Sequence, residues 1–496
     1  MKFRWYLGVL AISSVALLNS CSGLGSTAGC TTNCGGGTAN LTISLYDTPP
    51  TGTNVLSFTL PIAGISLTPN TGAPVSVATV VSSAEVTRLQ TDSTVIADQA
   101  SVLAGTYNTI SVTLGPTAAT NNIFLNTSGS TITSGTTSCL NNSICDLPVG
   151  AIFTVAVPLS MTLASNQNQW IGLDFNLNKA ITAPTPTSIA VDLSQTGVLT
   201  ATTTPRIGIP AGSVDTIEDY IGKVTAVSSS SITVQSGIAG TTLTAAVTST
   251  TEVDLAPVNY SNCTGTAMAC VTVGSTVSID TDLASDGSFT ATEIDVLDAV
   301  AVDEVEGIIL PTVSNGTVTG AQLILADKSA VTSSPLSSAT SGTDVILTLS
   351  GSATFTTDTN VLSSQLTAPP SFSGTGSLLP GQVVRVQVSG ISTDTNGNLT
   401  ATANNVLLRW SRLTGTVNSV GGNVFTVANL PSYINSLNTT LPLTPQVNTY
   451  PTLTAFDGIT GLSGSNFQVG QTVSFRALYL PQGATFPFEA NKIRVP

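Results

Sequence analysis

The chain has 496 residues, of which 41% are hydrophobic and only 8% are charged, with a net charge of −14 and no histidine. The apolar content is sufficient to bury several cores, which excludes a disordered chain and leaves room for about three or four domains. An acidic surface repels phosphate backbones, so nucleic acid is not expected as a partner. The absence of histidine excludes a Ser-His-Asp triad.

The first 20 residues have the pattern of a signal peptide. Lys2 and Arg4 precede an apolar run over residues 5–18, which is shorter than the ~20 apolar residues that a permanent membrane helix needs. Removing this segment takes away two positive charges and leaves a net charge of about −16. A secreted chain of low charge content is expected.

Cys21 directly follows Leu18-Asn19-Ser20, and this arrangement resembles the lipobox of bacterial lipoproteins. The resemblance implies lipidation of Cys21 and attachment to a membrane through the N-terminal lipid. The alternative is an ordinary signal peptide with an incidental cysteine. Ser22, in the place where such lipoproteins often carry an aspartate that retains them at the inner membrane, favours the outer membrane of a Gram-negative bacterium, on its periplasmic or surface face.

Residues 21–39 are rich in Gly, Ser and Thr, which is typical of a flexible tether. The cysteines after Cys21 fall into three close pairs: Cys30/Cys34, Cys139/Cys145 and Cys263/Cys270. Pairing by proximity is the simplest of the connectivities that six cysteines allow, and it predicts three small disulfide loops in an oxidising compartment. Zinc binding is the alternative, but the spacings are poor for zinc and no histidine is present.

Residues 40–205 predict an all-β domain. Apolar and polar residues alternate from Leu41 to Asp47, and several later segments repeat this period of two, each ended by turn residues. Six or more such strands favour a β-sandwich of the Ig-like or transthyretin-like kind. Within one of these strands Tyr107 follows a glycine turn and is expected to cap the core.

Three short motifs carry a family resemblance: Tyr46-Asp47-Thr48-Pro49, Leu103-Ala104-Gly105-Thr106-Tyr107 and Leu173-Asp174-Phe175-Asn176-Leu177. Their order resembles the family catalogued as domain of unknown function 4382. That family has no assigned activity. The Gly-x-Tyr strand also resembles those of transthyretin-like and carboxypeptidase-regulatory sandwiches, which are modules and not catalysts.

The rest of the chain is a repeat. Gly-x-Val-x-x-Val opens a unit at Gly222 and again at Gly415, a weaker copy opens at Gly307, and closing segments recur with matched spacing. We predict three tandem modules over 218–300, 301–409 (with an insertion) and 410–496, each with about five strands closed into a small OB-like barrel. The pattern resembles the family catalogued as domain of unknown function 5666, which also lacks an assigned activity.

Few residues offer chemistry. Asp280, Asp282 and Asp286 could supply oxygen ligands to calcium, but their position between two closing strands favours a solvated hairpin turn. A run of acids joins the first two repeats and is interpreted as a solvated linker, with a paired-carboxylate glycosidase as the alternative. Three aromatic residues could form a sugar-stacking platform, although core packing is the preferred reading. The acids are Asp295, Asp298, Asp303, Glu304 and Glu306, and the aromatic residues are Tyr107, Trp170 and Trp410.

No phosphate-binding loop, nucleotide fingerprint or Ser-x-x-Lys motif occurs in the sequence. We therefore expect no enzyme activity and no cofactor, and interpret the chain as a cell-envelope protein with a non-catalytic binding or structural role. Envelope proteins or glycans are the expected partners, and the sequence does not define an oligomeric state. A carbohydrate-binding surface lipoprotein is the first alternative, and a glycoside hydrolase is the second.

Overall fold

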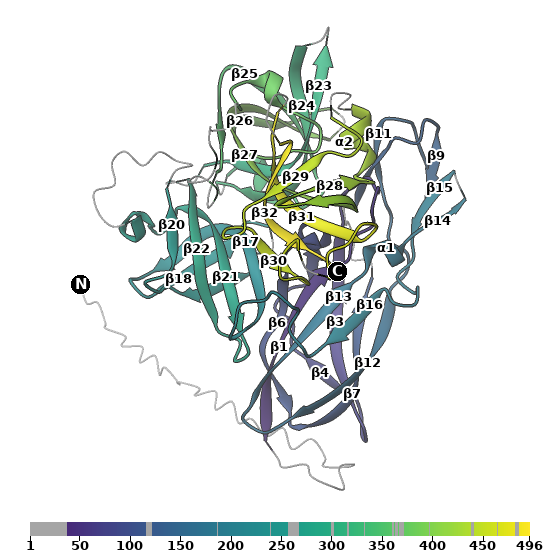
Figure 1. Ribbon diagram of the computed structural model, residues 1–496, viewed down its shortest axis with the longest axis vertical. Coiled ribbons are helices and arrows are strands. Elements are labelled where there is room, and N and C mark those ends of the chain that lie inside the picture. The colour runs from purple at the N-terminus through teal and green to yellow at the C-terminus, as the bar shows by residue number, and fades with distance from the viewer. Residues whose placement is uncertain are drawn as a thin grey trace, which may run out of the picture.

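The protein is built from four β-rich modules, one sandwich and three barrels, as the ribbon of the computed structural model shows (Figure 1). The structure describes residues 37–115, 122–185, 187–238, 240–255, 267–298, 302–314, 317–331, 333–359, 362, 366, 372–395, 397–437, 441–463, 465–481 and 486–496. The all-β fold class predicted from the sequence is confirmed. The expected signal peptide, the tether up to residue 36 and Cys21 lie outside the described residues.

The first module is a two-sheet sandwich closed around one apolar core. One sheet has the order β16-β13-β1-β6, in which β1 and β13 run parallel. The other has the order β12-β7-β3-β4, with β5 paired to β3. The strands of the first sheet are β1 (Thr38–Asp47), β6 (Thr94–Leu103), β13 (Asn168–Phe175) and β16 (Leu199–Thr202). Those of the second are β3 (Thr59–Pro69), β4 (Val75–Val77), β5 (Ser83–Glu85), β7 (Gly105–Leu114) and β12 (Phe153–Leu163).

Two small sheets complete this module, in the orders β11-β8-β2 and β10-β9-β15-β14. Their strands are β2 (Val55–Ser57), β8 (Ile123–Asn126), β9 (Ile132–Ser134), β10 (Thr137–Cys139), β11 (Ser143–Asp146), β14 (Ile181–Thr185) and β15 (Ser188–Val191). Leu56, Ile123 and Leu125 pack into the apolar core of the last barrel. The sandwich is therefore joined to the C-terminal part of the chain by buried apolar contact.

The three barrels share one topology. In each, the first strand pairs with the second and fourth, the second with the third, and the fifth with the fourth and, in parallel, with the third. This closed five-stranded order is that of an OB-type barrel. Closure pairs the strand edges of these Thr- and Val-rich segments and leaves fewer of them open to pairing with other chains.

Barrel 1 is formed by β17 (Ser213–Val227), β18 (Ser231–Ser236), β19 (Thr242–Ala246), β21 (Thr276–Ala284) and β22 (Phe289–Asp298), with β20 (Glu252–Asp254) beside β22. Barrel 2 is formed by β23 (Glu304–Ser314), β24 (Thr317–Ser329), β25 (Asp344–Thr357), β26 (Val383–Thr393) and the first half of β27 (Leu399–Gly421). Barrel 3 uses the second half of β27 with β28 (Val424–Ala428), β29 (Gln446–Thr449), β31 (Thr472–Tyr479) and β32 (Phe488–Arg494), and β30 (Ala455–Asp457) pairs with β32.

The glycines that begin each repeat have a common physical reason. A side chain at Gly222, Gly307 or Gly415 would collide with the backbone of the second strand of the same barrel. Only glycine allows the two strands to approach so closely where the first strand coils around the small barrel. The repeat motif therefore marks the closure of the barrel.

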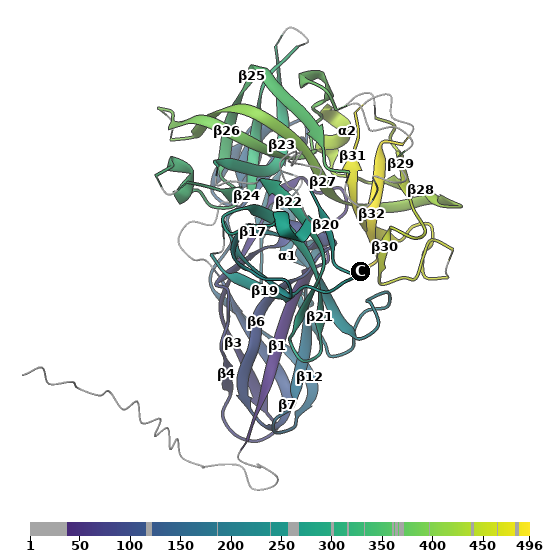
Figure 2. The same ribbon diagram turned by 90° about the vertical axis from the view of Figure 1, so that its left-hand side faces the viewer.

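Strand β27 joins barrels 2 and 3 without a linker. Its 23 residues are the fifth strand of barrel 2, paired with β26, and then the first strand of barrel 3, paired with β28 and β31. Figure 2 shows it passing between the two barrels. The three barrels gather at one end of the sandwich (Figures 1 and 2).

Helices are few and short. They are α1 (Leu177–Ala180), α2 (Ser432–Leu437) and the 3-10 turns η1 (Val86–Gln90), η3 (Ala267–Cys270), η4 (Pro335–Ser338) and η6 (Thr375–Ser377). Across the described ranges, none of these is long and apolar enough to cross a bilayer. The turn η1 lies between β5 and β6, and it carries sandwich residues into the junction with the barrels.

Candidate functional site

The most unusual feature of the molecule is a set of ion pairs buried where the four modules meet, which we call the charged junction. Eight of the 13 Lys and Arg residues of the chain take part, together with 11 of the 27 acids, and no side chain among them is more than 19% exposed. The basic members are Arg88, Arg206, Arg385, Arg409, Arg412, Arg476, Lys492 and Arg494. The acidic members are Asp92, Asp215, Glu218, Asp219, Asp280, Asp295, Glu304, Glu306, Asp327, Asp358 and Asp457.

Asp219 of barrel 1 is the centre of the junction. Its carboxylate accepts hydrogen bonds from Arg412 Nη2 at 2.5 Å and from Arg409 Nη2 at 3.1 Å, and Arg476 Nη1 lies 3.4 Å away. The register of β17 shifts between Ile217 and Tyr220, and Asp219 has a φ of +50°. Such a bulge re-aims side chains, and here it directs a carboxylate toward three guanidinium groups.

Arg412 and Arg476 connect Asp219 to the other modules. Arg412 Nε, on β27, donates to Asp92 Oδ2 of the sandwich at 2.5 Å. Arg476 Nη1, on β31, lies 3.0 Å from Glu218 Oε2 of barrel 1. Ion pairs of this kind are specific in geometry, because a buried carboxylate left without its partner is strongly unfavourable.

Arg409 is almost fully buried, at 1% exposure of its side chain. Besides Asp219, its guanidinium contacts Asp295 at 4.0 Å and Glu306 at 3.6 Å, and it donates to Asp358. These carboxylates come from both barrel 1 and barrel 2. A single guanidinium thus holds two barrels together.

A second group of pairs lies beside the N-terminal end of β17. Arg206 donates to Asp457 Oδ1 at 2.7 Å and to Asp215 Oδ1 at 2.8 Å, and its guanidinium stacks 4.1 Å from the centre of the Tyr46 ring. Arg494 donates to the other oxygen of Asp457 at 2.7 Å. This group ties the connection between the sandwich and barrel 1 to the C-terminal strand.

The remaining pairs lie on barrel 2 and at its contact with the sandwich. Arg385 Nη2 donates to Glu304 Oε2 at 2.6 Å, and Arg385 Nη1 lies 3.3 Å from Glu306. Arg88 of η1 reaches Asp327 at 3.5 Å and the carbonyl oxygen of Asp219 at 3.1 Å. Lys492 Nζ of barrel 3 donates to Glu218 at 2.5 Å, so every module contributes at least one charge.

The carboxyl groups of the junction differ in their pKa values. Burial alone would raise the pKa of Asp219, but Arg476, Arg412 and Arg409 hold it well below its usual range. Asp280 is buried with less compensation: burial raises its pKa to about 7, Arg476 opposes the rise, and the charges of Glu218 and Asp219 add to it. Burial likewise raises the pKa of Asp327 to about 6 against the opposing charge of Arg88.

This junction was not predicted from the sequence, and the interpretation of the acidic run as a solvated linker was wrong for three of its five residues. Asp295, Glu304 and Glu306 are 3–4% exposed and belong to ion pairs. A local signal was present in Leu408-Arg409-Trp410-Ser411-Arg412-Leu413, where two arginines interrupt a run that otherwise predicts a buried strand. In a chain with so few basic residues, such positions point to buried partners.

The other carboxylates singled out from the sequence occupy several environments. Asp280 accepts from the backbone N–H of Asp219 at 2.6 Å, Asp282 is half-buried on the same strand, and Asp286 is exposed and accepts from the Ser288 hydroxyl at 2.6 Å. Gly287 has a φ of +81°, as a tight turn requires. Within the described parts of the chain, no group of three or more acids or cysteines could hold a metal ion.

The three aromatic residues considered for sugar stacking are core residues. Tyr107, Trp170 and Trp410 are 2%, 4% and 1% exposed, so the preferred prediction of core packing is confirmed. Tyr107 donates to the carbonyl oxygen of Leu103 at 2.7 Å. Trp170 packs into the core of barrel 1 and donates to Ser44 Oγ at 3.0 Å, which in turn donates to Asp215.

Two of the six paired cysteines are joined within the described residues. Cys139 and Cys145 form a disulfide with their Cα atoms 5.9 Å apart, and the pair links β10 to β11. Cys270 is also disulfide-bonded, while its expected partner Cys263 lies outside the described residues. Cys30 and Cys34 lie outside them as well.

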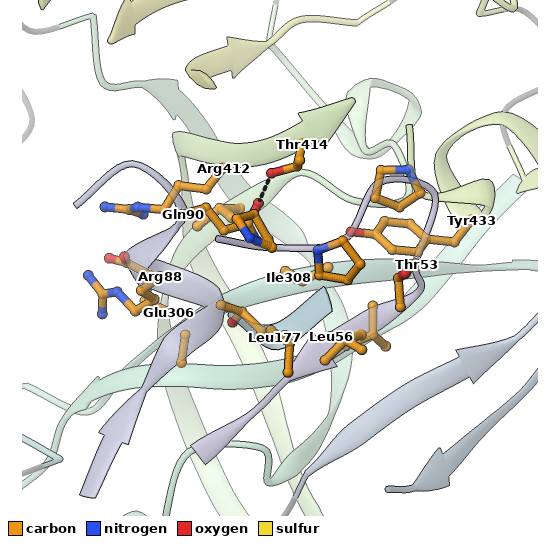
Figure 3. Close-up of a pocket in the computed structure, with 18 residues that line it drawn as sticks. Thr53, Leu56, Arg88, Gln90, Leu177, Glu306, Ile308, Arg412, Thr414 and Tyr433 are labelled. Atoms are coloured by element: carbon orange, nitrogen blue, oxygen red, sulfur yellow. Dashed lines mark hydrogen bonds between the residues drawn. The ribbon is translucent and has the colours of Figure 1, made fainter. Parts of the chain in front are cut away.

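Among the described residues, cavities lie at the contacts between modules. The smallest, about 50 Å³, lies between the sandwich and barrels 2 and 3. Figure 3 shows Arg88, Glu306 and Arg412 on one side of it and Tyr433 on the other, with Gln90 accepting from Thr414 at 2.8 Å. It has room for a water molecule or two but not for a ligand. A cleft of about 390 Å³ separates barrels 1 and 3, and a larger one of about 850 Å³ lies among the sandwich, barrel 1 and barrel 2.

Comparison with known families concerns the first module. Residues 38–191 match the model of the family described as Domain of unknown function (DUF4382). The sandwich is similar to this family. The match confirms the resemblance expected for the N-terminal domain, and it covers less than half of the chain, so it describes this module alone.

No curated protein matches the sequence. Among solved structures, Drosophila Unr CSD456 matches over 56% of this chain and 96% of its own chain, at 9% identity and a TM-score of 0.12. A likeness this weak supports no statement about fold or function.

Proposed function

We propose that this protein is a lipid-anchored cell-envelope protein with a non-catalytic binding and structural role. The observation that carries the proposal is the charged junction, in which ion pairs fix four modules to one another. Side chains that acid–base catalysis would need free are engaged there as structural partners. This arrangement agrees best with a rigid protein that the N-terminal tether holds away from the membrane.

The anchor rests on the N-terminal sequence. Lys2, Arg4, the apolar run and Cys21 support cleavage before Cys21 and lipidation of its thiol. Ser22 supports export to the outer membrane. The barrel topology and the recurring glycines support the resemblance of the three repeats to domain of unknown function 5666.

A glycoside hydrolase is the less favoured candidate. It would need a pair of carboxylates facing each other across a cleft, free to act as acid and nucleophile. Glu304 and Glu306 are instead held by Arg385, and Asp303 accepts from the backbone of Val331 at 2.9 Å. These three acids therefore have structural partners and are not free to act as acid and nucleophile.

The test of the proposal is metabolic labelling with a radioactive fatty acid, followed by fractionation of the envelope. The wild-type chain is expected to carry label and to sediment with membranes, whereas Cys21→Ser is expected to lose the label. A Cys30→Ser variant is the matched control and should keep it. Unlabelled wild-type protein would overturn the lipid anchor. Release of the fluorophore from fluorogenic glycosides by the purified chain would overturn the non-catalytic role.

A further inference from the structure

The largest of the cavities described above lies where the sandwich, barrel 1 and barrel 2 meet. Its volume is about 850 Å³, within the range of small-molecule and oligosaccharide sites. The sandwich contributes the segment before η1 and the start of β6, barrel 1 contributes the bulge of β17, and barrel 2 contributes the end of β24. Since three modules line it, the cleft exists only in the assembled protein.

The charges that line this cleft are already partnered. Asp92 is held by Arg412, Asp219 by Arg409 and Arg412, and Asp327 by Arg88. A charged ligand would have to displace one of these ion pairs, or it would lie in the cleft without an oppositely charged protein group to neutralise it. A neutral ligand avoids both costs.

The remaining two acids of the lining are partnered as well. Glu218 accepts from Lys492 at 2.5 Å. Glu85 accepts from the backbone N–H of Phe58 at 2.5 Å and from the Thr87 hydroxyl at 2.7 Å, and burial raises the pKa of Glu85. Each acid that lines the cleft therefore already has a hydrogen-bond or ion-pair partner.

Two side chains are placed to recognise a ligand. Tyr220, half-buried, is the aromatic residue of the lining, and its hydroxyl is fixed by donation to the carbonyl oxygen of Thr241 at 2.7 Å. Arg88 is the most exposed basic side chain of the charged junction, at 19%. A guanidinium has five N–H donors. Within the described residues, that of Arg88 pairs with Asp327, donates to the carbonyl oxygen of Asp219 and acts through its charge on Glu85 and Asp219.

The walls of the cleft carry hydroxyl groups and small apolar side chains. Thr79, Ser82 and Val80 are exposed at its rim, and Thr94 lies further along the lining. Hydroxyl side chains both donate and accept hydrogen bonds, as sugar hydroxyls do. Tyr220 lies beside them: its side chain packs partly against the core of barrel 1, and the half-buried remainder lines the cleft. A tyrosine ring has a flat apolar face that can stack on the C–H side of a sugar ring.

We propose that this cleft binds a neutral glycan segment, with Tyr220 stacking on a sugar ring and Arg88 donating to its hydroxyl groups. The inference rests on the proposed non-catalytic binding role and names its ligand class. The site differs from the aromatic platform considered from the sequence, whose three residues are buried in cores.

The experiment is calorimetric titration of the full chain with neutral hexasaccharides of glucose (α- and β-linked) and of N-acetylglucosamine. Hexagalacturonate, a glucosamine hexamer and a Gly-Ser hexapeptide serve as anionic, cationic and peptide probes. At least one neutral hexasaccharide is expected to bind, and the charged and peptide probes are expected to bind about tenfold more weakly or not at all. Binding of the peptide or of a charged probe in preference to every neutral sugar would overturn the proposal.

Variants then locate the site. Arg88→Ala and Tyr220→Ala are each expected to weaken binding about tenfold or more, whereas Tyr220→Phe, which keeps the ring, should change it by less than about threefold. Because Arg88→Ala also removes a contact of the charged junction, Ser82→Trp provides a second test by filling the rim without removing a pair. Ser160→Trp, on the exposed face of β12, is the matched control. Binding unchanged in Tyr220→Ala and Ser82→Trp would refute the site.

The same mixtures separate this inference from the proposed function. Chromatography of the sugars after incubation is expected to return them intact. Cleaved products together with binding at the cleft would overturn the non-catalytic role but leave the glycan site standing. Intact sugars without binding would overturn the glycan site and leave the anchored, non-catalytic role standing.

Discussion

The charged junction and the outer face of the sandwich use opposite chemistry. The junction gathers basic and acidic side chains away from water. The exposed face of the β12-β7-β3 sheet carries no charged residue in these strands; instead, threonines pair across it, such as Thr113 with Thr154 at 3.0 Å and Thr106 with Thr162 at 3.2 Å. Buried ion pairs thus fix the positions of the modules, whereas exposed hydroxyl groups make the surface of the sandwich polar.

This difference has an energetic basis. A buried ion pair contributes little net stability compared with apolar packing, but breaking one is costly because it leaves a buried charge alone. The junction therefore penalises any arrangement of the modules other than the observed one. A hydroxyl pair on the surface can exchange with water at little cost, so it imposes no such restriction.

The largest effect is expected from Arg409→Met. This change leaves Asp219, Asp295 and Asp358 without their shared partner, and it should lower the free energy of unfolding by about 3–5 kcal/mol. Urea denaturation followed by Trp fluorescence would measure it. Lys179→Met, at an exposed position, is the control and should stay within about 0.5 kcal/mol of wild type. Equal effects of the two changes would remove the distinction between junction and surface.

A smaller effect is expected at the disulfide. Replacing Cys139 and Cys145 together by serine opens a loop with a sequence separation of six, for which loop-closure entropy gives about 2 kcal/mol. The loss should be confined to the sandwich module and leave the junction unaffected. The measurement compares unfolding midpoints of the double variant and wild type without reductant, and a loss larger than that of Arg409→Met would contradict the ranking.

The pH dependence of stability tests the carboxyl groups of the junction. The pKa of Asp280 is raised to about 7 and that of Asp327 to about 6, so the folded state holds these protons more tightly than the unfolded state. Their contribution is complete below the unfolded pKa, near 4, and is lost as the pH rises through 6–7. We expect the free energy of unfolding to fall by about 1 kcal/mol or more between pH 5 and pH 8.

Substitutions separate the titration of Asp280 from that of the other carboxyl groups. Asp280→Asn should flatten the decline, because the amide still accepts from Asp219 but does not ionise. Asp286→Asn is the control: Asp286 is exposed, and hydrogen bonds from Ser288 lower its pKa, so its substitution should leave the slope between pH 5 and pH 8 unchanged. A wild-type protein that becomes more stable from pH 5 to pH 8 would contradict the assignment.

The smallest effect is expected on the outer face. Thr113→Val combined with Thr154→Val removes one cross-strand hydroxyl pair but keeps β-branched side chains, so stability should change by less than about 0.5 kcal/mol. Thermal unfolding would measure this. A loss comparable to that at the junction would mean that the hydroxyl face also holds the modules in place.

The sequence predicted the modules but not their arrangement. Strand alternation and the repeat glycines act over a few residues, so Leu41–Asp47 and Gly222 could be recognised without knowing the fold. The pair of Asp92 with Arg412 joins residues 320 positions apart. A local sequence pattern does not predict a contact between residues so far apart in the chain. The sharing of strand β27 by two barrels likewise depends on how two repeats meet.

The cleft proposed to bind a glycan could not be predicted from the sequence, for the same reason. Arg88 and Tyr220 come from different modules and have ordinary neighbours in the chain. The clearest available signal was the position of Arg409 and Arg412 within an otherwise apolar strand. This signal indicated that the two arginines are buried, but not which of the 27 acids form ion pairs with them.

The central claim, that ion pairs couple the modules, is tested most directly by a double-mutant cycle between Asp92 of the sandwich and Arg412 of β27. Unfolding free energies of wild type, Asp92→Asn, Arg412→Met and the double variant give the coupling energy of the pair. We expect about 1.5–3 kcal/mol, as for residues in one buried network. Additivity within about 0.3 kcal/mol, as for distant independent sites, would contradict the claim.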